Sequence, residues 1–288
     1  MRQTIAELPA ELTVRSLEPA DATACLRLSS LAEWNQSESH WRFLLEKGWG
    51  RGVTFDDMIV GTVVVLAYPN GIGWVGMILV DPVWRGRGLA TCLLQEAVEY
   101  CESVGLVPAL DATPEGQPIY KRLGFLDGGE LVRMRRPERR GDLAKSGGLD
   151  RGIELGEVAI RWDQELAGHD RSLTLKWMEE NWRDLCVGRT APDGRLEAAA
   201  WGRRGRTAVQ VGPFLARTPE AARSFLSDYF GCEETTWILD VPVRRSKFIG
   251  WLHSQGFEIE RSFTRMMRGR FGPDFRNELF AVAGPELG

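Results

Sequence analysis

The chain has 288 residues, enough for one large domain or two of ordinary size. Its composition, 43% hydrophobic and 26% charged, is that of a folded globular protein and excludes a disordered or collagen-like chain. The formal net charge of -4 argues against broad binding to nucleic acid or to an anionic membrane surface.

The chain contains 5 cysteines, an odd number, and no CxxC motif. We therefore expect neither a disulfide framework nor a zinc site, and no other metal is indicated. The N-terminal segment lacks the apolar core of a signal peptide, and no apolar run approaches the roughly 20 residues that a membrane span needs. These features predict a cytoplasmic protein with reduced thiols and no membrane partner.

Hydrophobic periodicity in the first half alternates between strand and helix. In chain order, the predicted elements are a strand (12–17), two helices (18–31, 37–47), a hairpin (52–55, 58–67), a strand (73–80), a long helix (86–104), a strand (107–112), a short helix (117–123) and a closing strand (130–135). This mixture predicts an α/β (α+β) fold.

Residues 135–148 read RRPERRGDLAKSGG, which is charged, contains glycine and has no apolar stripe. Such a composition is typical of a solvated linker. We therefore divide the chain into a first domain at 1–136, a linker at 137–152 and a second domain at 153–288.

Two landmarks recur after the linker at nearly the same spacing. Val211-Gly212-Pro213 follows Val80-Asp81-Pro82 by 131 residues, and we interpret both as strand ends. Gly256-Phe257 follows Gly124-Phe125 by 132 residues, and a short helix is expected before each. The spacing predicts two copies of one domain.

The segment VDPVWRGRGLATCLLQEAV, residues 80–98, predicts a strand, a glycine-rich turn and then a helix. Glycine lets the backbone approach a ligand closely, and the start of a helix presents free N–H groups and a positive dipole. Together they form a site for an anion such as a pyrophosphate. The segment has neither GxGxxG nor GK[ST], so it matches no dinucleotide or nucleoside triphosphate motif.

This segment resembles the signature loop of the GNAT superfamily of acyl-CoA-dependent N-acyltransferases, [Q/R]-x-x-G-x-[G/A], at Arg85, Gly88 and Ala90. Residues 119–125, IYKRLGF, resemble the Y-x-x-x-G-F segment of the same family. The chain as a whole is similar to bacterial tandem-GNAT proteins, including the segment 34–36 and the closing residues 283–288. The resemblance implies two tandem GNAT-like domains, each a mixed, mostly antiparallel sheet flanked by helices.

The resemblance also implies which residues bind acetyl-CoA and act on it. Tyr120 corresponds to the family tyrosine that donates a proton to the leaving CoA thiolate. A thiolate leaves more easily when a nearby O–H protonates it or donates a hydrogen bond to it. The implied acyl-CoA-binding residues are Ile78, Leu79, Val80, Arg85, Arg87, Gly88, Leu89, Ala90 and Thr91. The candidate acceptor-binding residues are Trp34, Asn35, Gln36 and Asp111.

The chain departs from the family pattern at the position of the general base. The predicted strand before the loop, residues 72–79, carries no Asp, Glu or His, and Thr113 stands where an Asn is common. Water, a substrate that arrives neutral, or a side chain could accept the proton. The candidate side chains are Glu38, His40, Asp111 and Glu115.

The second domain lacks the chemistry-bearing residues at the repeat spacing. Pro219 and Glu220 stand opposite Gly88 and Leu89, where proline removes an N–H donor and the carboxylate would repel a phosphate. Leu252 stands opposite Tyr120 and has no O–H. The second domain is expected to keep the fold, with Thr218 capping a helix that starts at Pro219, but not the acyl-CoA site.

The leading interpretation is an N-acetyltransferase that transfers acetyl from acetyl-CoA to a primary amine of a small molecule by direct attack. Two alternatives stay open: a non-catalytic acyl-CoA-binding regulatory protein, and another GNAT-type acyl or aminoacyl transferase or thiol-metabolite synthase. The sequence leaves the acceptor, the acyl chain and the oligomeric state open.

Overall fold

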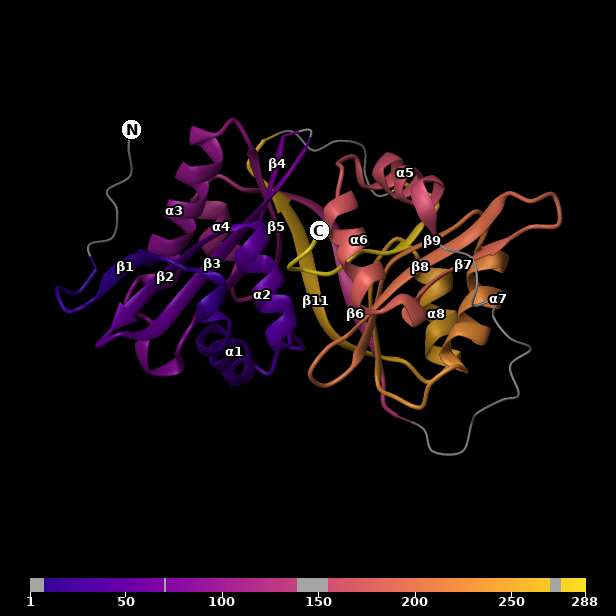
Figure 1. Cartoon of the computed structure of the whole chain (residues 1–288), viewed down its shortest axis with the longest axis horizontal. Helices are drawn as coiled ribbons and strands as arrows, with labels where there is room; N and C mark the ends of the chain where they lie inside the picture. The colour runs from indigo at the N-terminus through magenta and orange to yellow at the C-terminus, as the bar shows by residue number, and fades with distance from the viewer. Residues whose placement is uncertain (1–7, 70, 139–154, 270–275) are drawn as a thin grey trace.

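The computed structural model describes residues 8–69, 71–138, 155–269 and 276–288. The two halves of the chain lie side by side, and their strands form one continuous 12-stranded sheet (Figure 1). Residues 139–152 of the predicted linker, 137–152, lie outside the described residues.

The first half contains the predicted elements in the predicted order. They are β1 (Thr13–Ser16), α1 (Ala22–Leu31), α2 (Glu38–Lys47), β2 (Trp49–Phe55), β3 (Met58–Tyr68), β4 (Ile72–Val80), α3 (Leu89–Ser103), β5 (Val107–Ala112), α4 (Gln117–Arg122) and β6 (Leu126–Arg136). The long helix begins at Leu89, three residues later than predicted, because Gly86 and Gly88 take positive φ angles of 77° and 85° that end the preceding loop.

The second half repeats much of this order. Its elements are α5 (Gly156–Ala167), α6 (Ser172–Asn181), β7 (Cys186–Thr190), β8 (Leu196–Arg204), β9 (Val209–Ala216), α7 (Pro219–Phe230), β10 (Trp237–Pro242), α8 (Ser246–Ser254), β11 (Glu258–Met267) and β12 (Leu279–Ala281). Gly124 and Gly256 have φ angles of 85° and 83°, and the N–H of each following phenylalanine donates to the residue four positions before its glycine. The predicted Gly-Phe repeat is therefore a repeat of structure.

The two halves exchange a strand. The strand order is β1-β2-β3-β4-β5-β11-β6-β10-β9-β8-β7, so β11 lies between β5 and β6, while β6 lies between β11 and β10. Figure 1 shows β11 and β6 crossing the middle of the molecule. The mixed, mostly antiparallel character is confirmed, since among the described strand pairs only β4–β5 and β9–β10 are parallel. The two expected sheets, however, are joined into one.

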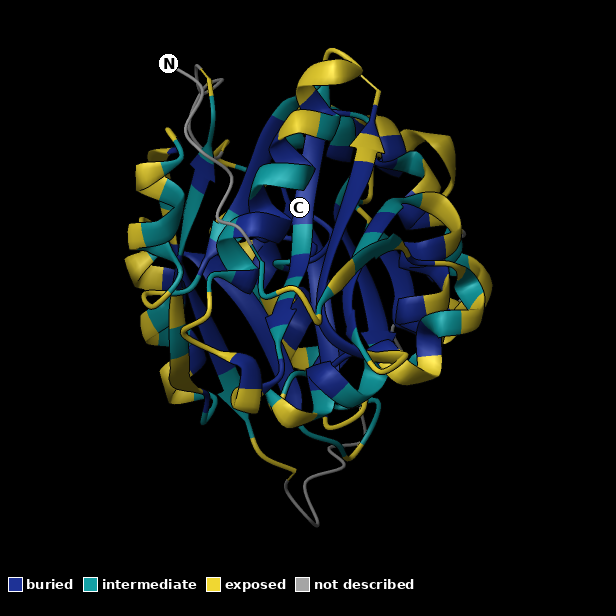
Figure 2. Ribbon diagram, turned by 90° about the vertical axis from the view of Figure 1, so that its left-hand side faces the viewer, coloured by how far each residue is buried: buried dark blue, intermediate teal, exposed yellow. Residues whose placement is uncertain are grey.

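Helices cover both faces of the sheet in the first half. Buried residues of α1 and α2 belong to a core that continues into the second half, whereas those of α3 form a separate core on the opposite face. Figure 2 shows the buried strands enclosed between partly exposed helices. In the described part of the chain no helix has both the length and the apolar character needed to cross a membrane.

One predicted landmark is wrong. Val211-Gly212-Pro213 does not close a strand as Val80-Asp81-Pro82 does, because β9 continues to Ala216. The proline is tolerated inside the strand because the β8–β9 register is irregular there, with Gly202 opposite Val211 and Ala200 opposite Phe214. The two strand-to-helix loops aligned by this landmark therefore differ in length. Two residues separate β9 from α7, whereas eight residues separate β4 from α3.

Candidate functional site

Strands β4 and β5 separate partway along their length. They pair only from Ile72–Val107 to Trp74–Ala109, and β4 then continues to Val80. Met77 has a positive φ of 55° at an irregularity in the β3–β4 register, and its carbonyl accepts a hydrogen bond of 2.8 Å from Thr62 Oγ1. This bulge turns β4 away from β5, so the main chain at 78–80 faces an opening between the two strands.

The start of α3 lies beyond the end of β4. Gly88 is its N-cap and makes no side-chain capping bond, so the first N–H groups of the helix have no side-chain acceptor there. Arg85 Nε donates to Val80 O at 3.2 Å, and the Arg87 guanidinium lies 4.6 Å from the centre of the Trp84 ring. The loop therefore presents free amides and two cations at a helix N-terminus, as an anion site requires.

The residues expected to bind acyl-CoA lie together along this route. Ile78, Leu79 and Val80 are on β4, and the remainder occupy the loop and the first turn of α3. Leu89 is buried, so its contribution to a ligand would be its main-chain N–H. The strand edge and the helix N-terminus together fit an amide-containing chain that ends in a pyrophosphate.

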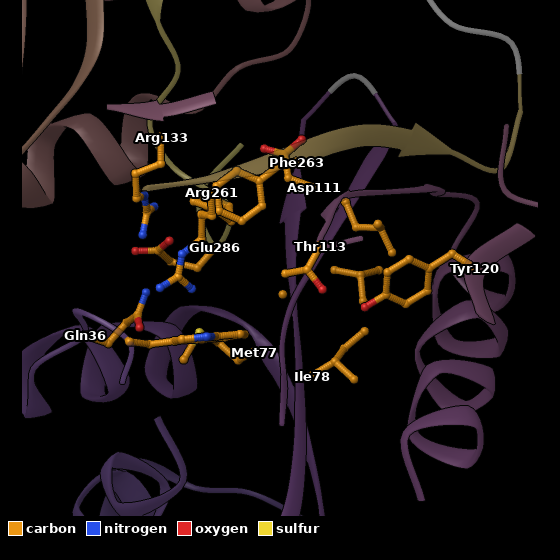
Figure 3. A pocket seen from close by; sticks show the side chains of 15 residues that line it. Gln36, Met77, Ile78, Asp111, Thr113, Tyr120, Arg133, Arg261, Phe263 and Glu286 are labelled. Atoms are coloured by element: carbon orange, nitrogen blue, oxygen red, sulfur yellow. The ribbon is translucent and has the colours of Figure 1, made fainter. Parts of the chain in front are cut away.

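A cavity of about 650 Å³, measured with its open mouth, lies at the β4–β5 opening. Figure 3 shows Tyr120, Thr113 and Ile78 at one end and Gln36, Arg261 and Glu286 at the other. Residues of the first half, of β11 and of the segment after β12 all contribute to its wall.

Tyr120 reaches the cavity from α4. Its ring packs near Phe125 with the centroids 6.1 Å apart, and its hydroxyl points toward Thr113 and Ile78 (Figure 3). Burial disfavours the phenolate and raises the pKa of Tyr120 to about 12. The side chain is therefore a protonated O–H donor throughout the neutral range.

The four residues predicted to contact the acceptor have different places. Trp34 and Gln36 line the cavity. Asn35 does not: its Oδ1 accepts hydrogen bonds from the N–H groups of Thr207 and Ala208, at 2.9 and 3.0 Å, and so ties the two halves together. Asp111 lines the cavity, but both its oxygens accept hydrogen bonds from Arg265, at 2.8 and 2.9 Å.

The other candidate bases lie away from the cavity wall. Glu38 pairs with Arg42 on the surface of α2, and Glu115 is exposed. His40 accepts a hydrogen bond from the N–H of Ser37 and stacks on Trp182 with the centroids 5.2 Å apart. Burial lowers the pKa of His40 to about 3, so the ring is neutral and part of the interface between the halves.

Sequence reasoning missed the cavity residues that come from far along the chain. Arg261 and Phe263 reach the cavity because β11 is inserted next to β5, and Glu286 reaches it from the segment after β12. The resemblance of residues 283–288 to other tandem proteins marked the segment, but no local signal placed it against β4.

The corresponding opening in the second half, between β9 and β10, is filled by the chain itself. Strand β12 pairs with β9, with Ala281 opposite Phe214, and Val282 N–H donates to Asp240 O on β10 at 3.0 Å. The Phe280 ring packs against Phe248 with the centroids 5.0 Å apart. A segment of protein thus occupies the place that is a cavity in the first half.

The helix start is also closed in the second half. Thr218 is the N-cap of α7, as predicted, and its side chain accepts a hydrogen bond of 3.1 Å from Ala221 N–H. Pro219 follows at the first helical position and has no N–H. This helix presents fewer free donors than α3 does.

Both halves match family models of acetyltransferases. Residues 12–125 match the Acetyltransferase (GNAT) family, and residues 159–281 match the Acetyltransferase (GNAT) domain. The chain is a GNAT acyltransferase-family protein with two such domains in tandem, from a family that uses acyl-CoA.

The relatives agree with this class. A holothin acyltransferase from Pseudoalteromonas sp. (strain SANK 73390) is 27% identical over 248 residues, which cover 84% of this chain and 82% of that protein. A putative acetyltransferase from Pyrococcus horikoshii has a TM-score of 0.77 at 18% identity, and the match covers 100% of this chain and 100% of that protein. A tandem GNAT protein from the clavulanic acid biosynthesis pathway has a TM-score of 0.64 at 15% identity, with 91% of this chain and 100% of that protein covered. The two solved structures show a shared fold.

Proposed function

We propose that this protein is an N-acetyltransferase that transfers the acetyl group of acetyl-CoA to a primary amine of a small molecule. The observation that carries the proposal is the position of Tyr120, whose hydroxyl faces the same cavity into which the separated edge of β4 opens. A thioester bound along that edge would bring its sulfur toward an O–H donor.

The acyl-CoA would be held by main-chain groups. The edge of β4 at residues 78–80 offers hydrogen bonds to the pantetheine amides, and the N–H groups at the start of α3 offer them to the pyrophosphate. Arg85 and Arg87 add positive charge beside those amides. The proposed domain division is that 1–136 holds the acyl-CoA site, 137–152 is the linker and 153–288 is the partner domain.

The reaction is a direct attack of the amine on the thioester carbonyl. A C–N bond forms and the C–S bond breaks, the nitrogen loses a proton to solvent, and the departing sulfur gains one. Tyr120 is the general acid that protonates or hydrogen-bonds the sulfur, and it recovers its proton from solvent. A phenol pKa of about 12 keeps the donor protonated before the thiolate forms.

The acceptor would enter the cavity opposite Tyr120, where Trp34 and Gln36 line the wall. The walls of the cavity come from both halves, and small-molecule sites commonly lie where two domains meet. The matching of residues 12–125 to an acetyltransferase family supports acetyl as the transferred group.

The test is a screen of small amines, diamines, amino acids and short peptides for acceptor-dependent release of free CoA from acetyl-CoA. We expect release with at least one small primary amine, together with its N-acetyl product by mass spectrometry. Tight acetyl-CoA binding with no acetylated product across the panel would instead favour a regulatory acyl-CoA-binding protein, and activity confined to peptides would overturn the small-molecule assignment.

A further inference from the structure

The segment that follows β12 runs from the second half onto β4. Trp74 Nε1 donates to Pro285 O at 2.9 Å, and the Tyr68 hydroxyl donates to Leu287 O at 2.7 Å. A Cβ on Gly76 would lie 3.2 Å from the Glu286 Cα, so the lack of a side chain on β4 makes room for this segment. Glu286 is thereby fixed in the wall of the cavity.

Only one of the two oxygens of the Glu286 carboxylate accepts a hydrogen bond from another described residue. It is 4% exposed, and its Oε1 accepts a hydrogen bond of 2.8 Å from Arg203 Nη2. Within the part of the chain that the structure describes, Glu286 Oε2 has no hydrogen-bond partner, and neither does Gln36 Oε1 nearby. Burial alone would raise the pKa of Glu286. The charges around it, that of Arg203 first, and a hydrogen bond from its own main-chain N–H together outweigh burial and lower the pKa, so the group is a carboxylate.

We propose that Glu286 determines acceptor specificity by accepting, at Oε2, a hydrogen bond from an N–H or O–H group at the far end of the acceptor from its reacting amine. This inference rests on the proposed function. Figure 3 shows Glu286 and Tyr120 at opposite ends of the cavity, so one acceptor reaching between them needs a nucleophile at one end and a donor at the other.

The chemistry of that end of the cavity favours a donor. A buried oxygen without a partner costs free energy, which a ligand N–H or O–H removes and a methyl group does not. Arg133 is already paired with Asp240 by two hydrogen bonds of 2.8 Å. An acceptor with a second polar group is therefore selected over one that ends in a hydrocarbon, because a site built around a hydrogen bond discriminates strongly against analogues that lack it.

Replacing Glu286 with Gln separates this role from a structural one. Arg203 is buried and needs an acceptor, so the amide oxygen of the variant would face Arg203. Its –NH₂ would then occupy the place of Oε2, and an acceptor of hydrogen bonds would become a donor. The expected result is an altered preference between substrates, which simple loss of folded protein cannot produce.

The probes are three amines of equal length: 1-aminopentane, 4-aminobutan-1-ol and 1,4-diaminobutane, which end in methyl, hydroxyl and ammonium groups. Binding to the CoA-loaded full-length protein is measured by ligand-observed NMR, and acetyl transfer is measured separately by CoA release. We expect the protein to bind the hydroxyl and ammonium probes at least about ten-fold more tightly than the methyl probe. Glu286→Gln should reduce the preference for the ammonium probe over the methyl probe to about two-fold or less, because the new –NH₂ cannot accept a hydrogen bond. The hydroxyl probe should lose less, because its oxygen can accept a hydrogen bond from that –NH₂.

Glu278→Gln is the matched control, because it makes the same change just before β12. Glu278 pairs with Arg217 and accepts a hydrogen bond from Trp162, and it does not line the cavity. This variant should keep the full preference. Equal binding of the three probes to the unmodified protein, or an unchanged preference for the ammonium probe in Glu286→Gln, would overturn the role of Glu286. Preference without acetyl transfer would leave that role standing and count against the proposed function.

Discussion

The two halves of this protein share a fold, but the corresponding opening in the sheet is a cavity in the first half and is filled by a strand in the second. In the first half β4 and β5 separate around a cavity that Tyr120 faces. In the second half β9 and β10 separate around β12, whose Phe280 packs on Phe248. The duplicated domain keeps its geometry, and a strand of its own chain satisfies the backbone groups that a ligand could otherwise bind.

The position of one small residue shows how this difference arises. At the repeat spacing of 132 residues, Gly116 and Tyr120 of the first half correspond to Phe248 and Leu252 of the second. Both second-half residues are buried. Large apolar side chains thus fill the second half where, in the first half, Tyr120 lines the cavity and Gly116 leaves room for its ring.

The largest effect is expected from separating the halves. A chain ending at residue 138 lacks β11 and therefore leaves facing edges of β5 and β6 unpaired. We expect such a fragment to aggregate and to show no cooperative thermal unfolding. A full-length protein cut at a protease site inserted between 138 and 155 should instead elute as one particle in size-exclusion chromatography. A monomeric fragment that binds acetyl-CoA normally would contradict the exchanged-strand explanation.

The next effect concerns the loop before α3. Gly88→Glu places a side chain where φ is 85° and adds negative charge at the expected phosphate site, so acetyl-CoA affinity should fall by roughly 100-fold. Gly105→Glu is the control, since Gly105 lies beyond the other end of α3, has a φ of 73°, and a Cβ added there would meet no atom within 4 Å.

Calorimetric titration measures both variants and the unmodified protein. One acetyl-CoA site per chain is expected, because β12 fills the second opening. Two equivalent sites per chain, or equal loss of affinity in both glycine variants, would contradict the contrast between the halves.

A smaller effect is expected at Tyr120. Tyr120→Phe removes only the O–H, so kcat should fall by roughly 10- to 100-fold while acetyl-CoA affinity stays the same, since a thiolate is already a good leaving group. Tyr100→Phe makes the same change on a ring stacked against Trp49 and should have no such effect. Because burial raises the pKa of Tyr120 to about 12, ionisation of this group should not reduce the rate between pH 7 and 10.

The smallest effect is expected at Gly116. A Cβ there would lie 2.8 Å from Tyr120 Cε2 and 3.0 Å from its Oη, while the backbone, at φ -79°, accepts any residue. Gly116→Ala should therefore displace the hydroxyl and lower kcat by about 3- to 10-fold, with little change in melting temperature. In a Tyr120→Phe background the same substitution should change kcat much less. An equal loss in both backgrounds would show that Gly116 acts on something other than the hydroxyl.

The sequence by itself determined the features that depend on neighbouring residues. The glycine-rich loop before α3, the Thr218 cap with Pro219, and the Gly-Phe turns at 124 and 256 all form from contacts within a few positions. Turn and capping chemistry is local, so the element order of the first half followed from its pattern. The local pattern gave a wrong strand end at Val211-Gly212-Pro213, because β9 pairs with β8 on both sides of the proline and continues past it.

Only the tertiary structure decided which distant segments complete the cavity. The exchange of β6 and β11, the filling of the second opening by β12 and the arrival of Glu286 beside β4 all depend on which strand edges meet. Residues 111 and 265 pair across 154 positions of the chain, and no periodicity reports such a contact. Edge pairing and burial are properties of the assembled sheet, and for that reason the sequence did not show that Arg261, Phe263 and Glu286 line the cavity.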